Sequence, residues 1–290
     1  MSFDFPNAPA LNQTFQGYIW DGEKWTSNAT LSPPPKPPPS ASTQRGYLFG
    51  LDMRATTTVT VTPGTAADST GAVMMNLAAA MTKTVAAWAA GNNGGGLDQG
   101  AIANATWYHW YLIYNPTTLA VDVIFSATAT PDAGPLMPPG YTLFRRIGSL
   151  RFTSSAVWFG FVQNGDEVLY AVSNNDVNNA AVPIPNRVLF AVLVPPGVVV
   201  NALLRITCAG VNSGTTFIIT SPDESDQAVL ITGAGSSMRL PSTSPVDAHA
   251  AHFNVRTDTL GRFGIRSATG GAATVYVSTY GYIDRRGKDG

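Results

Sequence analysis

The sequence predicts an all-β protein in three parts: a short N-terminal aromatic hairpin, a polyproline spacer, and one or two antiparallel β-sandwich or jelly-roll-like domains. Two observations support this prediction. Short runs of β-branched and aromatic residues recur along most of the chain with turn residues between them, which is typical of sandwiches and barrels. Nearer the N-terminus, six prolines within the seven positions Pro33–Pro39 cannot donate hydrogen bonds to a helix or a sheet.

Residues 1–30 are expected to form a small β unit with an aromatic surface. Two strand-like runs lie on either side of Asp21-Gly22, a dipeptide typical of tight hairpin turns. The aromatic side chains that we take as candidate anchoring or interface residues are Phe15, Tyr18, Trp20 and Trp25. A two-stranded hairpin cannot bury four such rings by itself. We therefore expect them to pack on a partner protein or on a symmetry-related copy.

Residues 31–45 form the predicted spacer between this head and the rest of the chain. A polyproline II segment rises about 3.1 Å per residue, so the proline run has a semi-rigid reach of about 20 Å. A small head, a stiff spacer and a large body indicate a protein that attaches at one end and presents the other. Two alternatives stay open, a docking site for an aromatic groove and a flexible joint.

The body is predicted to contain a β domain at residues 46–174, followed at residues 175–290 by a second β domain or by a continuation of the first. The expected seam between them is the Asn-rich segment Asn174–Asn179. The most strongly predicted hairpin joins Thr106–Tyr114 to Leu119–Phe125, because both runs are aromatic or β-branched and a turn separates them.

The remaining body segments carry weaker signals. Met74–Ala90 is rich in alanine and is compatible with a helix or with strands. Further strands are expected at residues 47–53, 56–62, 145–152, 156–162, 168–172, 187–194, 198–209, 215–220, 229–232, 252–256, 261–266 and 274–283. Their short lengths and regular spacing favour an antiparallel arrangement over a parallel one.

The strand at 106–114 is aromatic on both sides. Alternation places on one face Trp107, His109, Tyr111 and Ile113, and on the other Tyr108, Trp110, Leu112 and Tyr114. One face has to be core, and we expect the other to lie in a subunit interface or to stack on sugar rings. The candidate interface or glycan-stacking residues are Trp107, Tyr108, Trp110 and Tyr111. Core or subunit interface is the favoured interpretation, and His109 is expected to be structural.

The composition excludes several classes of function. Only 12% of the 290 residues are charged and the net charge is −1, so the chain lacks the basic surface that nucleic-acid binding requires. The basic cluster Arg285, Arg286 and Lys288 is expected to be solvated. The single cysteine, Cys208, cannot form an intrachain disulfide and is expected to be buried. No apolar run approaches the length of a membrane span, and Met1–Pro6 does not resemble a secretion signal.

Two clusters of polar residues are candidate chemical sites. Asp247–His252 contains two histidines three positions apart, which could bind a metal on a helix, but flanking prolines favour a loop. Asp223–Asp226 contains three carboxylates without the glycine and spacing of a calcium loop, and it is more typical of a solvated turn. No nucleophile elbow, phosphate-binding loop or Cys/His cluster is present. The sequence therefore predicts no metal, no cofactor, no catalytic residue and no enzymatic activity.

Several segments resemble structural proteins of tailed bacteriophages. Pro6–Phe15 together with Trp20–Trp25 resembles a short N-terminal module of such proteins. The segments that resemble tail and tail-fibre proteins are Pro63–Thr70, Gly94–Gly100, Thr106–His109, Gly140–Gly148 and Gly281–Gly287. The resemblance touches both ends of the chain and much of residues 47–152.

This resemblance implies a non-enzymatic component of a virion that is assembled in the cytoplasm of the bacterial host. Residues 1–30 would bind other virion proteins, and the β-rich body would serve host-surface attachment as a tail fibre or tail-associated protein. By analogy with fibres we expect a homo-oligomer, with a trimer favoured, and host surface polysaccharide as a candidate partner. The alternatives are a head fibre or capsid decoration protein, and a carbohydrate-binding module. A polysaccharide-cleaving enzyme is disfavoured because no opposed pair of carboxylates is apparent.

Overall fold

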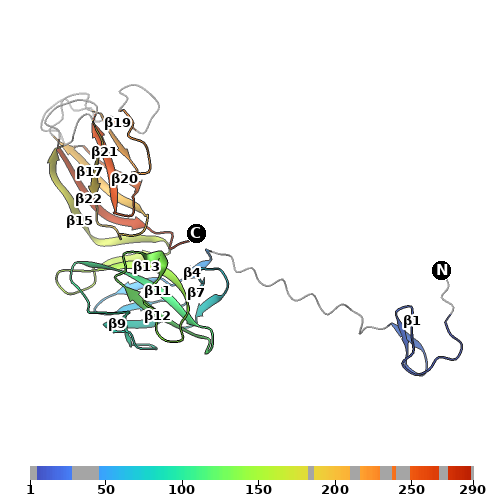
Figure 1. Ribbon diagram of the computed structural model, residues 1–290. Helices are drawn as coiled ribbons and strands as arrows, with labels where there is room; N and C mark the ends of the chain where they lie inside the picture. Colours follow the sequence, from blue (N-terminus) through green and yellow to red (C-terminus); the bar gives the residue numbers. More distant parts are fainter. Residues whose placement is uncertain are drawn as a thin grey trace. The chain divides into compact units, whose positions relative to one another are not determined.

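The computed structural model describes residues 5–27, 46–181, 186–209, 216–228, 237–239, 249–267 and 274–288. The chain divides into two compact units, Met1–Ser42 and Thr43–Gly290 (Figure 1). The regular structure of the described residues is all-β, with one short 3-10 turn, η2, at Pro131–Ala133. This confirms the predicted fold class. The predicted spacer at 31–45 and the strand expected at 229–232 lie outside the described residues.

The N-terminal unit contains a three-stranded antiparallel sheet in the order β1-β2-β3. Its strands are β1 (Thr14–Phe15), β2 (Tyr18–Trp20) and β3 (Trp25–Ser27). The predicted hairpin is confirmed, since Trp20 pairs with Trp25 and the Asp21 carboxylate accepts hydrogen bonds from the Glu23 and Lys24 amides at 2.9 and 2.8 Å. Strand β1 was not predicted. It exists because Gln16 and Gly17 adopt positive φ angles and turn the chain within what looked like one strand.

The first lobe of the large unit comprises the strands up to residue 152, in two sheets. A three-stranded sheet has the order β4-β7-β8, with β4 Leu48–Gly50, β7 Gly64–Ala67 and β8 Met74–Leu77. A seven-stranded sheet has the order β13-β11-β12-β10-β9-β6-β5. Its strands are β5 Met53–Ala55, β6 Val59–Val61, β9 Met81–Ala87, β10 Gly95–Leu97, β11 Thr106–Asn115, β12 Ala120–Ser126 and β13 Leu143–Phe152. The pairing is antiparallel except at β10, which runs parallel to both of its neighbours.

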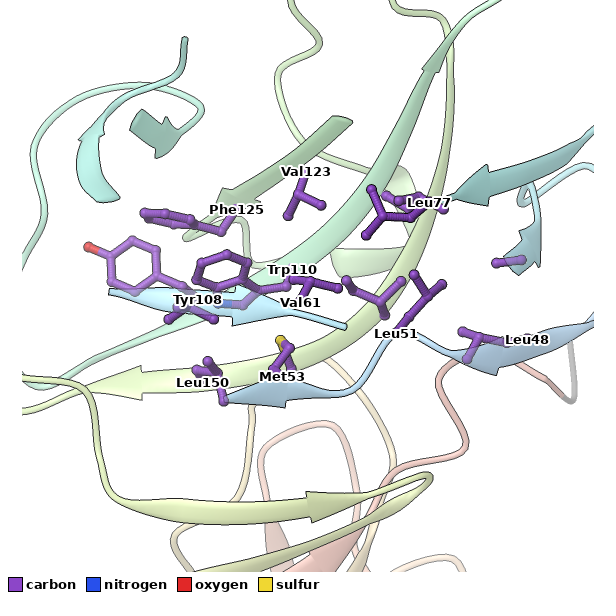
Figure 2. Packing of buried hydrophobic residues seen from close by; sticks show 14 of the residues in the cluster. Leu48, Leu51, Met53, Val61, Leu77, Tyr108, Trp110, Val123, Phe125 and Leu150 are labelled. Atoms are coloured by element: carbon purple, nitrogen blue, oxygen red, sulfur yellow. The ribbon is translucent and has the colours of Figure 1, made fainter. Parts of the chain in front are cut away.

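Side chains from both of these sheets form one core (Figure 2). Tyr108 and Trp110 of β11 lie beside Phe125 of β12, and the Trp110 and Phe125 rings are 4.5 Å apart between centroids. Leu48 and Leu77 of the smaller sheet belong to the same cluster. Burial of such large rings dominates the stability of a core of this kind.

The second lobe is a β-sandwich of two antiparallel sheets, in the orders β14-β15-β22-β17-β20 and β16-β21-β18-β19. The strands are β14 Phe161–Asn164, β15 Glu167–Ala181, β16 Val188–Ala191, β17 Asn201–Ala209, β18 Thr216–Thr220, β19 Ser237–Arg239, β20 His249–Arg256, β21 Arg262–Ser267 and β22 Thr274–Ile283. Leu204 and Val277 of the first sheet pack with Phe217 and Phe263 of the second in a common core. Cys208 is buried in it, as predicted, and burial raises the pKa of its thiol to about 12.

Two sequence-based expectations are resolved by these sheets. Met74–Ala90 forms strands β8 and β9, not a helix, with alternate residues of β8 buried. The seam expected at Asn174–Asn179 is wrong, because these residues lie inside the continuous strand β15. There the Asn-rich run produces irregular pairing with β22 instead of a break. By its sheets, the body divides between β13, which ends at Phe152, and β14, which begins at Phe161.

Candidate functional site: the aromatic head and the seam between the lobes

The aromatic rings of the head form one cluster, which we call the head cluster: Phe5, Phe15, Tyr18, Trp20 and Trp25. Phe5 lies in its centre, stacked on Trp25 with centroids 5.2 Å apart and edge-on to Tyr18 at 5.4 Å. All five side chains are only partly buried within the described residues. The cluster therefore holds the small unit together and still presents apolar ring surface.

Phe5 is a member of the cluster that the sequence does not predict. It precedes Pro6 and lies outside any strand, so neither periodicity nor a turn signal marks it. The four rings that were predicted are brought together as expected. Their packing on a partner is a prediction that the described contacts do not test.

The predicted glycan-stacking residues of β11 have to be corrected. Tyr108, Trp110 and Tyr111 are at most 1% exposed, so these three rings cannot stack on a sugar or contact a second subunit. Both faces of the strand are covered within the chain. The face with Tyr108 and Trp110 meets the first-lobe core, whereas the Tyr111 hydroxyl donates to the Pro131 carbonyl at 2.9 Å. Trp107 is half-buried and packs edge-on against Tyr282 of the second lobe, at 6.1 Å between centroids.

His109 lies on the same strand and is structural, as expected. It is buried, and its Nδ1 lies 2.8 Å from the Ser149 hydroxyl. Burial, together with the positive charge of Arg146, lowers its pKa to about 3. The imidazole is therefore neutral at physiological pH. Its contact with Ser149 connects strand β11 to strand β13.

A buried ion pair joins the two lobes at the seam. Both guanidinium Nη atoms of Arg146, on β13, donate to the carboxylate of Asp284, at 2.7 and 2.6 Å. Burial favours the neutral acid, but the charge of Arg146 outweighs it and holds the pKa of Asp284 below its usual value. The Tyr282 hydroxyl donates to the Ser149 carbonyl at 2.7 Å and adds a second link.

The segment after β22, residues 284–288, returns to the first lobe, and we call it the tail. Arg286 is 2% exposed, so the expectation of a solvated side chain is wrong for this residue, whereas Arg285 is exposed as expected. Its guanidinium contacts the Gly50 carbonyl at 3.2 Å and the Asp166 carboxylate at 3.3 Å. Lys288 pairs with the same Asp166 at 2.6 Å. A Cβ on Gly46, whose φ is +93°, would collide with the Lys288 carbonyl, so the first described residues of the body lie against the tail.

A cavity of about 500 Å³ opens where the first lobe, the second lobe and the tail meet. Five arginines of the described residues line it: Arg145, Arg146, Arg256, Arg285 and Arg286. Two carboxylates, Asp132 and Asp284, lie in the same wall. The arginines come from β13, from the end of β20 and from the tail. No local pattern in the sequence therefore predicts this cavity.

The two polar clusters considered in the sequence do not come together as chemical sites. Asp223 pairs with Arg256 at 2.8 Å and Asp226 with Arg266 at 3.0 Å, while the Glu224 carboxylate accepts from the Ser221 amide at 3.0 Å. His249 and His252 lie on strand β20, not on the helix that a shared metal face would need. Among the residues that the structure describes, which exclude Asp247, no group of three His, Cys, Asp or Glu side chains could hold a metal ion.

The comparisons with known proteins add no relative. Neither the models of protein families, nor the curated protein sequences, nor the solved structures contain a match to this chain. Within the described ranges, no helix has the length and apolar character needed to cross a membrane.

Proposed function

We propose that the chain is a non-enzymatic structural component of a tailed-bacteriophage virion, a tail fibre or tail-associated protein whose N-terminal unit attaches to other virion proteins. The observation that carries the proposal is a separate small unit with a half-exposed aromatic cluster, ahead of a large all-β body. Partly exposed rings of this kind are typical of protein interfaces. The resemblance of the N-terminal segments to structural proteins of tailed phages, and of Gly281–Gly287 to tail and tail-fibre proteins, supports the same role.

The body has features suited to presentation. Gly46, where the described body begins, lies against Lys288 of the tail, at the seam between the lobes. The chain therefore enters the body beside the tail, and in our proposal the parts of the body away from this point contact the host surface. The predicted proline spacer would hold this body away from its attachment point.

Deletion of residues 1–30 tests the attachment role. Particles assembled with the shortened chain should lack the protein, whereas the full chain should be incorporated. Trp25→Ser and Tyr18→Ser should reduce incorporation as well, because they remove rings of the head cluster. Leu11→Ser is the matched control, since Leu11 is 66% exposed and lies outside that cluster. Normal incorporation of the deleted chain would overturn the proposal.

A head fibre or a capsid decoration protein is the alternative within the same class, because a small anchor and a large body suit either surface. Electron micrographs of particles that carry an antibody-labelled body distinguish label on the phage tail from label on the capsid.

The expected self-association now rests on the analogy with fibres, since the aromatic strand that first motivated it is buried within one chain. Sedimentation of the full chain at micromolar concentration should show a trimer, and a monomer would count against the fibre assignment.

A further inference from the structure

The cavity between the lobes has the size of a small-molecule site. Its volume of about 500 Å³ exceeds what a single inorganic anion fills and lies within the usual range for ligand pockets. Such pockets occur preferentially where two domains meet. The residues described as lining it belong to the unit Thr43–Gly290.

The arginines of the cavity fall into two groups. Arg145, Arg146 and Arg286 are buried and form a fixed part of the wall, where Arg146 is held by Asp284 and Arg286 by Asp166. Arg256 and Arg285 are exposed at its opening. Arg256 is paired with Asp223, but both side chains of this pair are more than half exposed, at 59% and 54%. An exposed ion pair of this kind contributes little to the stability of the protein. A ligand anion can therefore replace Asp223 as the partner of Arg256.

The remaining lining suits a polar ring more than a bare anion. Phe144 and Pro131 supply apolar surface, and Ser69, Asn201 and Thr259 supply hydroxyl and amide groups. Asp132 is exposed in the wall and can accept a hydrogen bond from a hydroxyl group. Guanidinium groups recognise carboxylate and phosphate oxygens through paired hydrogen bonds.

We propose that this cavity binds an acidic saccharide, a sugar that carries a carboxylate or a phosphate group, with Arg256 and Arg285 on the anionic group and the polar wall on the ring hydroxyls. This inference goes beyond the virion role and does not depend on it. The isolated protein can bind a saccharide whether or not it is incorporated into a particle, and such binding does not show that it is incorporated.

Calorimetric titration of the full chain at low salt tests the proposal. The probes are glucuronate, glucose 1-phosphate, uncharged glucose and inorganic phosphate. Glucuronate and glucose 1-phosphate should both bind, and binding should weaken as salt is raised. Arg256→Ala and Arg285→Ala should each weaken it about tenfold, the loss of one charge-assisted contact. Arg54→Ala is the matched control, since Arg54 is exposed on β5 and does not line the cavity.

Several outcomes would overturn the inference. Equal binding of glucose and glucuronate would remove the role of the charge. Inorganic phosphate binding as tightly as glucose 1-phosphate would remove the role of the sugar. Equal weakening by Arg54→Ala would mean a general charge effect, and failure of both acidic sugars to bind at millimolar concentration would leave no site. The melting temperatures of Arg256→Ala and Arg285→Ala should be unchanged, and Arg285→Lys should retain part of the binding. These two results would show that the variants lose binding without losing their fold.

Discussion

Lys83 and Asp122 form an ion pair inside the first lobe, with Nζ 2.6 Å from Oδ1 and both side chains at most 2% exposed. The Lys83 ammonium also donates to the carbonyls of Ala89 and Gly91, at 2.8 and 3.0 Å. Asp122 in turn accepts from the Gly91 amide at 2.7 Å. The pair therefore ties the loop between β9 and β10 to strand β12. Burial lowers the pKa of Lys83, and the charge of Asp122 opposes that effect.

Asp122→Ala should be strongly destabilising, by about 3–5 kcal/mol, because it leaves a buried ammonium without its counter-charge. The double variant Lys83→Met with Asp122→Leu should recover part of this loss, since it removes both charges, although the Gly91 amide stays unpaired. Urea unfolding of the single and double variants measures both values. If the loss in the double variant equalled the sum of the losses in the Lys83→Met and Asp122→Leu single variants, the two residues would not be energetically coupled.

Asp284→Asn should destabilise the seam by about 3 kcal/mol, because the buried Arg146 loses its counter-charge. Asp223→Asn is the matched control. It breaks an ion pair of similar length, 2.8 Å, but an exposed one, and should cost less than about 1 kcal/mol. The same urea titrations give both numbers. Equal effects of the two substitutions would contradict the conclusion that the Arg146–Asp284 pair is one of the contacts that hold the lobes together.

Acid should destabilise the protein through His109. Its folded-state pKa of about 3 lies below the ordinary value of 6.5, so the unfolded chain binds a proton in that interval and the folded chain does not. Stability should therefore fall as the pH drops from about 6.5 towards 3, by about 1.4 kcal/mol per unit. His109→Gln should lose less stability over the same range, measured as the difference between unfolding free energies at pH 7 and pH 5. Parallel pH profiles of the two proteins would exclude the mechanism.

Alkali should act through the buried phenol of Tyr282. Burial raises its pKa well above 10, so above about pH 10 the unfolded chain loses a proton that the folded chain keeps. Stability should fall as the pH rises beyond that point. Tyr282→Phe removes this dependence, at the cost of the hydrogen bond to Ser149, and should show a flatter profile between pH 9 and pH 11 in thermal unfolding. A profile as steep as that of the unsubstituted protein would refute the prediction.

Local signals in the sequence were sufficient for the fold class and for single elements. The alternation and turn residues around Thr106–Phe125 predict the β11–β12 hairpin, and its observed register, with Asn115 opposite Ala120, follows from the short turn. Asp21-Gly22 predicts the head hairpin in the same way. Each of these features depends on residues within a few positions of one another, where side-chain periodicity and φ preferences act directly.

Tertiary structure decided everything that joins distant segments. Asn174–Asn179 looks like a break, but the Asp176 carboxylate accepts the Thr279 and Leu193 amides, both at 2.8 Å, and keeps the segment within the sheet. Arg286 looks solvated by its neighbours in sequence, yet the chain folds it against Gly50, 236 positions away. The arginine-lined cavity likewise unites residues 69, 131, 256 and 285. Contacts of this kind arise from burial and charge pairing between strands far apart in the chain, and no local pattern records them.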